Sequence, residues 1–154
     1  MKLKYLLQGS AIAAMYVVLT MLLSPISYGP MQVRISEALT IFPCFTPAAV
    51  PGLFVGCLVS NLIGPYGIVD VICGSLATLI AALASYFLKD RKWLVPLPPV
   101  IANGIIIGGM LHFAYGVPNL PVCMIWVAAG QTLSCYLIGM PLIKIFEKYK
   151  GIFK

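Results

Sequence analysis

The sequence is poor in charged residues. Only 9% of its 154 residues are charged, with 10 Lys or Arg residues against 4 Asp or Glu residues. A soluble domain carries about 25% charged residues, whereas 61% of this chain is hydrophobic. We therefore predict an all-α integral membrane protein. At about 20 apolar residues per crossing, the length allows about six spans in a single transmembrane domain, residues 1–154, without an attached soluble hydrolase.

Residues that commonly carry catalysis or bind metals are scarce. The chain has one histidine, His112, and no G-x-x-x-x-G-K-[ST] phosphate loop. Its cysteines contain no C-x-x-C pair and lie within apolar stretches, where they are expected to be small packing residues. We therefore expect no catalytic residue, no metal and no cofactor in this chain. The cysteines are Cys44, Cys57, Cys73, Cys123 and Cys135.

The positions of the charges define the expected spans. The first and third uncharged stretches each fit one helix, and the fourth fits two, because Gly116 and Pro118 interrupt it. The second contains Pro43, Pro47 and Pro51, which divide it into two pieces that are short for a full crossing. We expect these two pieces to form a bent or tilted helical hairpin, with a re-entrant pair as the alternative. The uncharged stretches are Tyr5–Val33, Ala38–Val69, Val71–Leu88 and Trp93–Ile143.

Basic residues mark the cytoplasmic side of a membrane protein. Six spans with both termini in the cytoplasm place every basic residue except Arg34 on that side. The net charge of +6 then reflects topology rather than a nucleic-acid-binding patch. The inward residues are Lys2, Lys4, Lys89, Arg91, Lys92, Lys144, Lys148, Lys150 and Lys154.

Polar side chains within the spans fall mainly in the expected outer half. Such groups are costly in the membrane unless they line a cavity. Their distribution predicts a ligand-capture pocket that opens to the exterior and is closed toward the cytoplasm by apolar residues. The candidate substrate-binding residues are Arg34, Glu37, Asn61, Tyr66, Asp70, Asn103, Trp126 and Gln131.

The two intramembrane carboxylates each have a structural and a functional interpretation. Glu37 follows Arg34 by three residues, so the two could form an ion pair within one helix. Asp70 could cap the helix that begins beside it. Alternatively, either carboxylate could accept N–H groups of a cationic or donor-rich ligand, while Trp126 or Tyr66 supplies a flat face. A lid is expected over residues 27–32.

Small residues recur at helical spacing on the first span. Gly9 and Ala13, with Ser10 and Ala14 beside them, form a small-x-x-x-small pattern. Most such patterns serve helix packing within one chain. The pattern on the first span is the best candidate for docking a partner protein.

Three segments carry a resemblance to a known family. They are Y-G-P-M-Q-V-R-I-S-E-A-L-T at 28–40, T-P-A-A-V-P-G-L-F-V-G-C at 46–57 and Y-G-I-V-D-V-I-C-G-S-L-A-T at 66–78. Through them the chain resembles the QueT family, the substrate-binding (S) components of energy-coupling factor (ECF) transporters for queuosine precursors.

The resemblance implies a six-helix S component that binds a deazaguanine base outside the cell, such as aminomethyl-deazaguanine or queuine. Its implied partners are a transmembrane coupling protein, docked on the first helix, and two cytoplasmic ATPases that consume ATP. One departure concerns the sixth helix, where this chain has Gly130-Gln131 and the family pattern has a Glu. A neutral amide there would not provide a counter-charge for an aminomethyl group.

Three alternatives stay open at this point. An S component for another vitamin, such as riboflavin, thiamine or biotin, is the nearest. A self-contained ion-coupled permease is less consistent with the sequence, because the two halves show no convincing inverted repeat. A membrane-embedded enzyme is least consistent, because no nucleophile lies near a base at comparable depth.

Overall fold

The computed structural model describes residues 2–29 and 32–149, and within these residues every regular element is a helix. The expected helical class is therefore confirmed. The elements are α1 (Lys2–Leu22), α2 (Ser24–Ser27), the 3₁₀ helix η1 (Ile35–Cys44), α3 (Ala49–Ile63), α4 (Ile68–Phe87), the short 3₁₀ helix η2 (Lys92–Leu94), α5 (Leu97–Phe113), α6 (Leu120–Thr132), the π-helical segment η3 (Leu133–Gly139) and α7 (Met140–Lys148).

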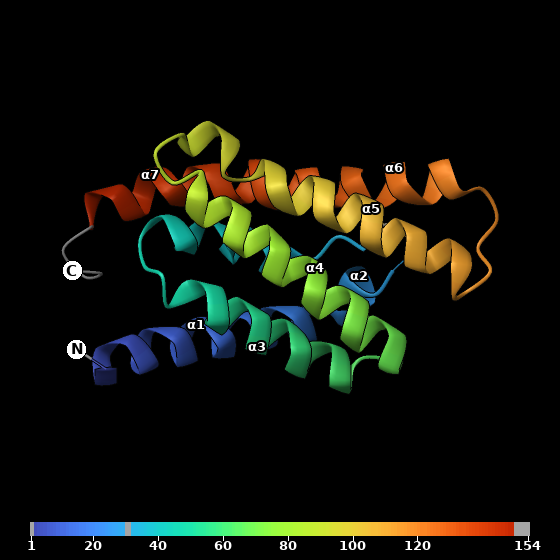
Figure 1. Cartoon of the computed structure of the whole chain (residues 1–154), viewed down its shortest axis with the longest axis horizontal. Coiled ribbons are helices and arrows are strands. Elements are labelled where there is room, and N and C mark those ends of the chain that lie inside the picture. Colours follow the sequence, from blue (N-terminus) through green and yellow to red (C-terminus); the bar gives the residue numbers. More distant parts are fainter. Residues whose placement is uncertain (1, 30–31, 150–154) are drawn as a thin grey trace.

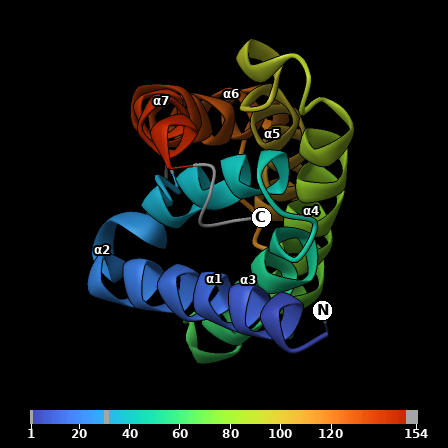
Figure 2. The same cartoon turned by 90° about the vertical axis from the view of Figure 1, so that its left-hand side faces the viewer.

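The long helices run back and forth along one axis of an elongated bundle (Figure 1). Helix α1 packs on α3, α3 on α4, α4 on α5 and α5 on α6, while η1 contacts α1, α4 and η3. The end-on view shows η1 between the α1–α3 layer and the α6–α7 layer (Figure 2). The polar residues of η1 are therefore placed inside the bundle.

The N-terminal end of α1, the C-terminal end of α7 and the α4–α5 connection lie at the same end of the molecule (Figure 1). These segments carry the described basic residues that the sequence assigns to one membrane side, and Lys150 and Lys154 lie outside the described part of the chain. Within the described residues, four segments are long and apolar enough to cross a membrane, namely Lys2–Leu22, Ile68–Phe87, Lys92–Phe113 and Leu120–Lys148. The six-span count and the cytoplasmic position of the termini stay predictions, because η1 and α3 are shorter apolar helices.

Prolines shape the region between η1 and α3. Pro43 lies inside η1, where it has no N–H to donate to the helix. After Cys44 the chain turns, and the Thr46 hydroxyl accepts a hydrogen bond from the Ala48 N–H at 3.3 Å. Two short helices thus occupy the second uncharged stretch, as its prolines predict.

The small residues of α1 are divided between two faces. A Cβ at Gly52 would lie 2.6 Å from the Gly9 carbonyl oxygen, and one at Gly56 would lie 3.1 Å from Ala13 Cα. Gly9 and Ala13 therefore allow α1 and α3 to approach closely. Ser10 and Ala14 are exposed, so they alone of the predicted docking residues are largely free to meet another surface.

Candidate ligand-binding site

Glu37 lies at the centre of a buried polar network. It is 1% exposed, and its Oε1 accepts hydrogen bonds from the Tyr16 hydroxyl and, at 3.0 Å, from the Thr78 hydroxyl. Its Oε2 has no partner. Asn103 on α5 lies close to the same carboxylate. Side chains from α1, η1, α4 and α5 thus meet at the Glu37 carboxylate, of which only Oε1 accepts hydrogen bonds.

Arg34 forms its ion pair with Asp70. The Nη2–Oδ2 distance is 3.2 Å, and the two side chains are 3% and 0% exposed. The interpretation in which Arg34 pairs with Glu37 within one helix is therefore wrong. Arg34 precedes η1 with extended backbone dihedrals of φ −88° and ψ 99°, so the two residues do not share a helical face. Glu37 remains available for another role.

Cys57 joins the two halves of the network. Its sulfur accepts hydrogen bonds from Thr78 at 3.3 Å, Asn61 at 3.4 Å and Arg34 Nη1 at 3.8 Å. Asn61 also donates to the Asp70 carbonyl at 3.0 Å. The acid network around Glu37 and the Arg34–Asp70 pair are consequently one continuous cluster.

Several buried polar atoms in this region have no hydrogen-bond partner. An unsatisfied buried group costs about 1–3 kcal/mol, so a concentration of such groups calls for an explanation. They include both hydrogen-bond donors and hydrogen-bond acceptors, which is what a ligand with acceptor and donor groups of its own requires. The atoms are Gln32 Nε2, Arg34 Nε, Glu37 Oε2, Asn61 Oδ1, Ser75 Oγ and Asn103 Nδ2.

Three tyrosines link the connections at the opposite end from the termini. The Tyr66 hydroxyl donates to the Tyr28 carbonyl at 2.8 Å, and the Tyr115 hydroxyl donates to the Tyr66 carbonyl. The Tyr28 hydroxyl donates to the Ser60 carbonyl at 2.6 Å. Burial raises the pKa of Tyr28 to about 12, so its hydroxyl keeps its proton at neutral pH. We call Tyr28, Tyr66 and Tyr115 the tyrosine clasp.

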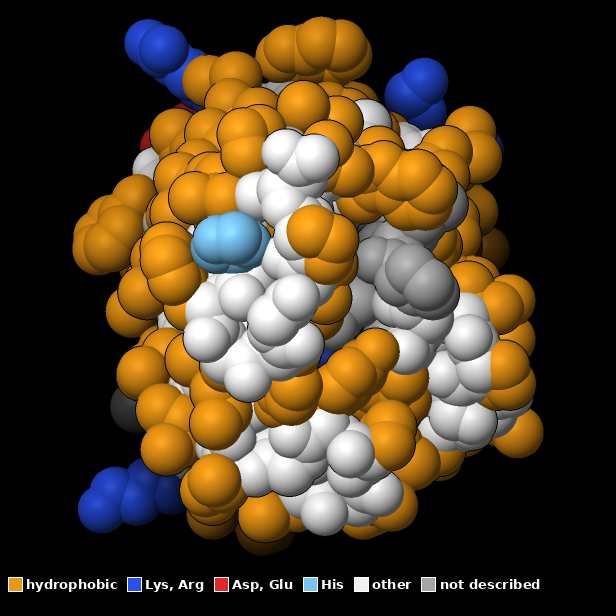
Figure 3. All heavy atoms as spheres, turned by 90° about the vertical axis from the view of Figure 1, so that its right-hand side faces the viewer, with side chains coloured by type: hydrophobic (Ala, Val, Ile, Leu, Met, Phe, Trp, Pro, Cys, Tyr) orange, Lys and Arg blue, Asp and Glu red, His pale blue; other side chains and the backbone are white. Residues whose placement is uncertain are grey.

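The clasp lies directly beside the buried cluster. The Tyr28 ring centroid is 5.3 Å from Arg34 Cζ, a cation–π distance. Figure 3 views this end of the molecule and shows uncharged polar and backbone atoms gathered beside the single histidine. Most visible Lys and Arg side chains lie at the rim of the view. The visible surface at this end is thus mainly neutral.

The structure brings most of the predicted site residues together, but not all. Gln131 is 2% exposed and accepts a weak hydrogen bond from Cys135 Sγ at 3.8 Å. The same thiol donates to the Glu37 carbonyl at 3.5 Å, which places Gln131 at the edge of the cluster. Trp126 lies outside it, because its side chain is 47% exposed on α6.

Three members of the cluster, and the buried Gln32 two residues before Arg34, were not among the predicted site residues. Tyr16, Cys57 and Thr78 lie in apolar helices, where each is an ordinary packing residue. Gln32 was assigned only to the lid over 27–32, of which residues 30 and 31 lie outside the described part of the chain. A usable signal existed for Tyr16 alone, a large hydroxyl-bearing residue in the middle of the first span. Among the described residues, no group of three or more His, Cys, Asp or Glu side chains is arranged to hold a metal ion.

Comparison with known proteins identifies the family. The QueT transporter family model matches residues 6–148. The queuosine precursor transporter QueT of Lactococcus lactis subsp. cremoris (strain MG1363) is 43% identical over 82 residues, which are 52% of this chain and 48% of that protein. The match thus spans about half the length of this relative. No solved structure matches the chain. Because the family model covers nearly the whole sequence, the chain belongs to the QueT transporter family.

Proposed function

We propose that this chain captures a queuosine precursor, a deazaguanine base such as aminomethyl-deazaguanine or queuine, in the buried cluster. The family membership and the name of the Lactococcus relative support a substrate of this class. The observation that carries the proposal is the Glu37 carboxylate, which is buried and has one oxygen without a partner.

A deazaguanine presents two adjacent N–H groups, and a carboxylate can accept such a pair in bidentate fashion. Glu37 fits this role better than Asp70, because Asp70 is already neutralised by Arg34. Asn103 lies close to the Glu37 carboxylate, and Gln131 lies at the edge of the cluster, so these two amides are the proposed partners of the ring nitrogens. Tyr66 provides an aromatic face near the cluster, whereas the exposed Trp126 does not.

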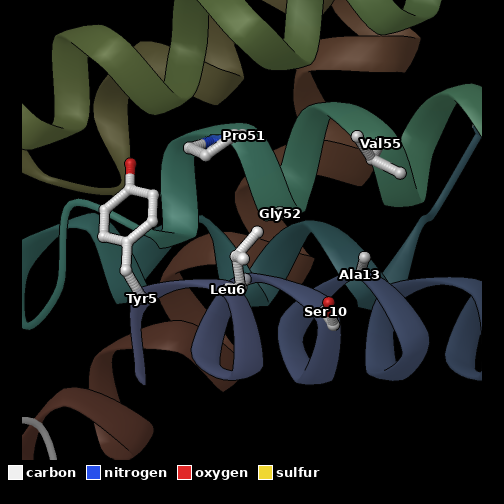
Figure 4. Close-up of a pocket in the computed structure, with 8 residues that line it drawn as sticks. Tyr5, Leu6, Ser10, Ala13, Pro51, Gly52 and Val55 are labelled. Carbon is white, nitrogen blue, oxygen red and sulfur yellow. The ribbon is translucent and has the colours of Figure 1, made fainter. Parts of the chain in front are cut away.

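We further propose that the chain is the S component of an ECF importer, with both termini in the cytoplasm of the cell. Its partners would then be a transmembrane coupling protein and two cytoplasmic ATPases that supply ATP hydrolysis. An apolar groove of about 210 Å³ follows the contact between α1 and α3. Figure 4 shows Tyr5, Leu6, Ser10 and Ala13 of α1 facing Pro51, Gly52 and Val55 across it. This groove, with the exposed Ser10 and Ala14, is the proposed docking surface for the coupling protein.

Calorimetry on the purified chain tests the substrate and the site. We expect one member of a deazaguanine series to bind tightly, and Glu37→Gln to weaken it at least tenfold, or about 1.4 kcal/mol. Asp70→Asn is expected to act through Arg34 and to weaken binding as well. The exposed Asp90→Asn serves as the matched control and should bind as the wild type does. Unchanged affinity in both Glu37→Gln and Asp70→Asn would place the pocket elsewhere.

Reconstitution in vesicles tests the transporter class. The isolated chain should bind the base without transporting it, and uptake should require both the coupling module and ATP. Uptake by the chain alone would instead identify a self-contained permease. Tight binding of riboflavin, thiamine or biotin in the same calorimetric panel, without deazaguanine binding, would identify an S component for another vitamin.

A further inference from the structure

Gln32 combines two features that cost stability. Its backbone has a φ of +44°, in the left-handed region that residues with a side chain rarely adopt. Its side chain is 1% exposed, and the Nε2 donor is buried without a partner. Among all residue types, glycine would adopt this backbone at the lowest cost and would leave no amide unsatisfied. The side chain of Gln32 therefore needs a reason beyond folding.

Backbone hydrogen bonds hold Gln32 in this position. Its N–H donates to the Gly29 carbonyl at 2.9 Å, and its carbonyl accepts from the Arg34 N–H at 2.9 Å. The second bond closes a tight turn around Val33. Gln32 and Arg34 are both buried, whereas Val33 is partly exposed. The turn thus directs the side chains of residues 32 and 34 to the inside of the bundle.

The two inward side chains offer donors of the same kind. Arg34 uses Nη2 for Asp70 and Nη1 for Cys57, which leaves its Nε without a partner. Gln32, two residues before Arg34 and likewise buried, has an equally unpaired Nε2. Asp70 already balances the positive charge of Arg34, so the pair does not call for an anion. Two unused N–H donors in a neutral setting match a carbonyl oxygen.

We infer that Gln32 is a specificity residue whose Nε2 donates to the carbonyl oxygen of the bound base, with Arg34 Nε as the neighbouring donor. This inference rests on the proposed function and adds a second recognition point to it. Glu37 accepts hydrogen bonds from the N–H groups of the base, and Gln32 donates one to the carbonyl oxygen beside them. Together they distinguish a guanine-type edge from an adenine-type edge, which carries an amino group in place of the oxygen.

The test pairs two ligands with two variants. The ligands are aminomethyl-deazaguanine and its thioxo analogue, which keeps both N–H groups but replaces the carbonyl oxygen by sulfur, a weaker acceptor. Gln32→Glu replaces the donor by an oxygen of similar size. Gln32→Gly removes the amide and suits the left-handed backbone, so its melting temperature without ligand should equal or exceed that of the wild type.

We expect the wild type to bind the oxo base at least tenfold more tightly than the thioxo base. Both variants should bind the oxo base about tenfold more weakly than the wild type does, whereas their affinity for the thioxo base should fall much less. Equal losses for the two bases, or no loss, would overturn the role of Gln32 while leaving the proposed function intact. If the wild-type chain binds neither of these bases nor queuine, the proposed function fails and this inference fails with it. Gln32→Gly keeps the test valid if Gln32→Glu does not fold.

Discussion

Arg34 and Asp70 are an ion pair from which water is almost completely excluded, with exposures of 3% and 0%. Removing one member of such a pair leaves an uncompensated buried charge and typically costs about 3–5 kcal/mol, whereas replacing both by apolar residues can be nearly neutral. We therefore expect Asp70→Leu to lower the free energy of unfolding by about 3–5 kcal/mol. The double variant Arg34→Met with Asp70→Leu should recover most of that loss.

Denaturant unfolding in detergent measures both variants. The Thr78→Val variant is a useful comparison, because it removes a hydroxyl from the same cluster without leaving an unpaired charge. If the double variant is as unstable as Asp70→Leu alone, the instability arises from lost packing and not from the charge of Arg34. Ligand binding is a separate readout, since the double variant keeps Glu37 but loses the proposed Arg34 Nε donor.

Single residues show where prediction from sequence was sufficient and where it was not. Glu37, Asp70, Asn61 and Asn103 were identifiable because carboxylates and amides are costly inside a membrane. The partner of Arg34 was not identifiable, because Asp70 lies 36 residues away in sequence, whereas Glu37 follows Arg34 by only three residues. The exposure of Trp126 depends on the rotation of α6, which periodicity leaves undefined in a helix that is apolar on all sides.

Helices α5 and α6 are held at close distance by a glycine. A Cβ at Gly108 would lie 2.6 Å from Met124 Cα, whereas one at Gly109 would meet nothing within 4 Å. We expect Gly108→Ala to separate the two helices and to destabilise the protein by about 1–3 kcal/mol. Gly109→Ala is the matched control and should leave stability unchanged or slightly raised, because alanine favours the helix. Equal melting temperatures for the two variants would contradict this packing.

The tyrosine clasp connects the segment after α2, the α3–α4 connection and the α5–α6 connection. Tyr115→Phe removes one hydroxyl from it and keeps the ring. A hydrogen bond contributes about 0.5–1.5 kcal/mol, so we expect the bound base to dissociate about two- to tenfold faster. Stopped-flow competition measures this rate. Tyr5→Phe, which removes a hydroxyl near the opposite end, should leave it unchanged, and equal effects of the two variants would argue against a clasp.

Helix boundaries were predictable where helix-breaking prolines interrupt an apolar stretch. Pro43, Pro47 and Pro51 divide the second uncharged stretch, and two short helices are found there. The π-helical segment Leu133–Gly139 was not predicted. Gly139 at its end and Pro141 just after it mark a weak point in the helix, because proline cannot donate to the preceding turn. They do not predict a π-helix, whereas the structure shows the segment packed against η1. Such segments are frequent at functional sites, and this one carries Cys135 to the Glu37 carbonyl.

At the scale of the whole molecule, the positions of the basic residues predict how the protein is oriented in the membrane. The basic segments lie at the end of the bundle that holds both termini (Figure 1), and the tyrosine clasp lies at the other end. A cluster that is reached from the clasp end would then receive its ligand from outside the cell. The six-span prediction further requires that η1 and α3 cross the membrane, as the four longer apolar segments are expected to do.

The lengths of η1 and α3 make that requirement testable. With 10 and 15 residues, they extend about 20–23 Å at the usual rise per residue, which is less than the hydrocarbon core of about 30 Å. We expect them to cross in a locally thinned bilayer, because hydrophobic mismatch of this size is tolerated. Pro47, between the two helices, then faces the cytoplasm, and Pro65, after α3, faces outward.

Both prolines are exposed, so each can be replaced by cysteine and labelled with a membrane-impermeant thiol reagent in whole cells. Pro65→Cys should react in intact cells, whereas Pro47→Cys should react only after the membrane is opened. The wild-type chain, whose described cysteines are buried or partly buried, gives the background. Reaction of both variants in intact cells would show a re-entrant pair instead. In that case the number of crossings between the termini falls by two, while both termini still share one side. The labelling result therefore separates the depth of η1 from the orientation of the protein.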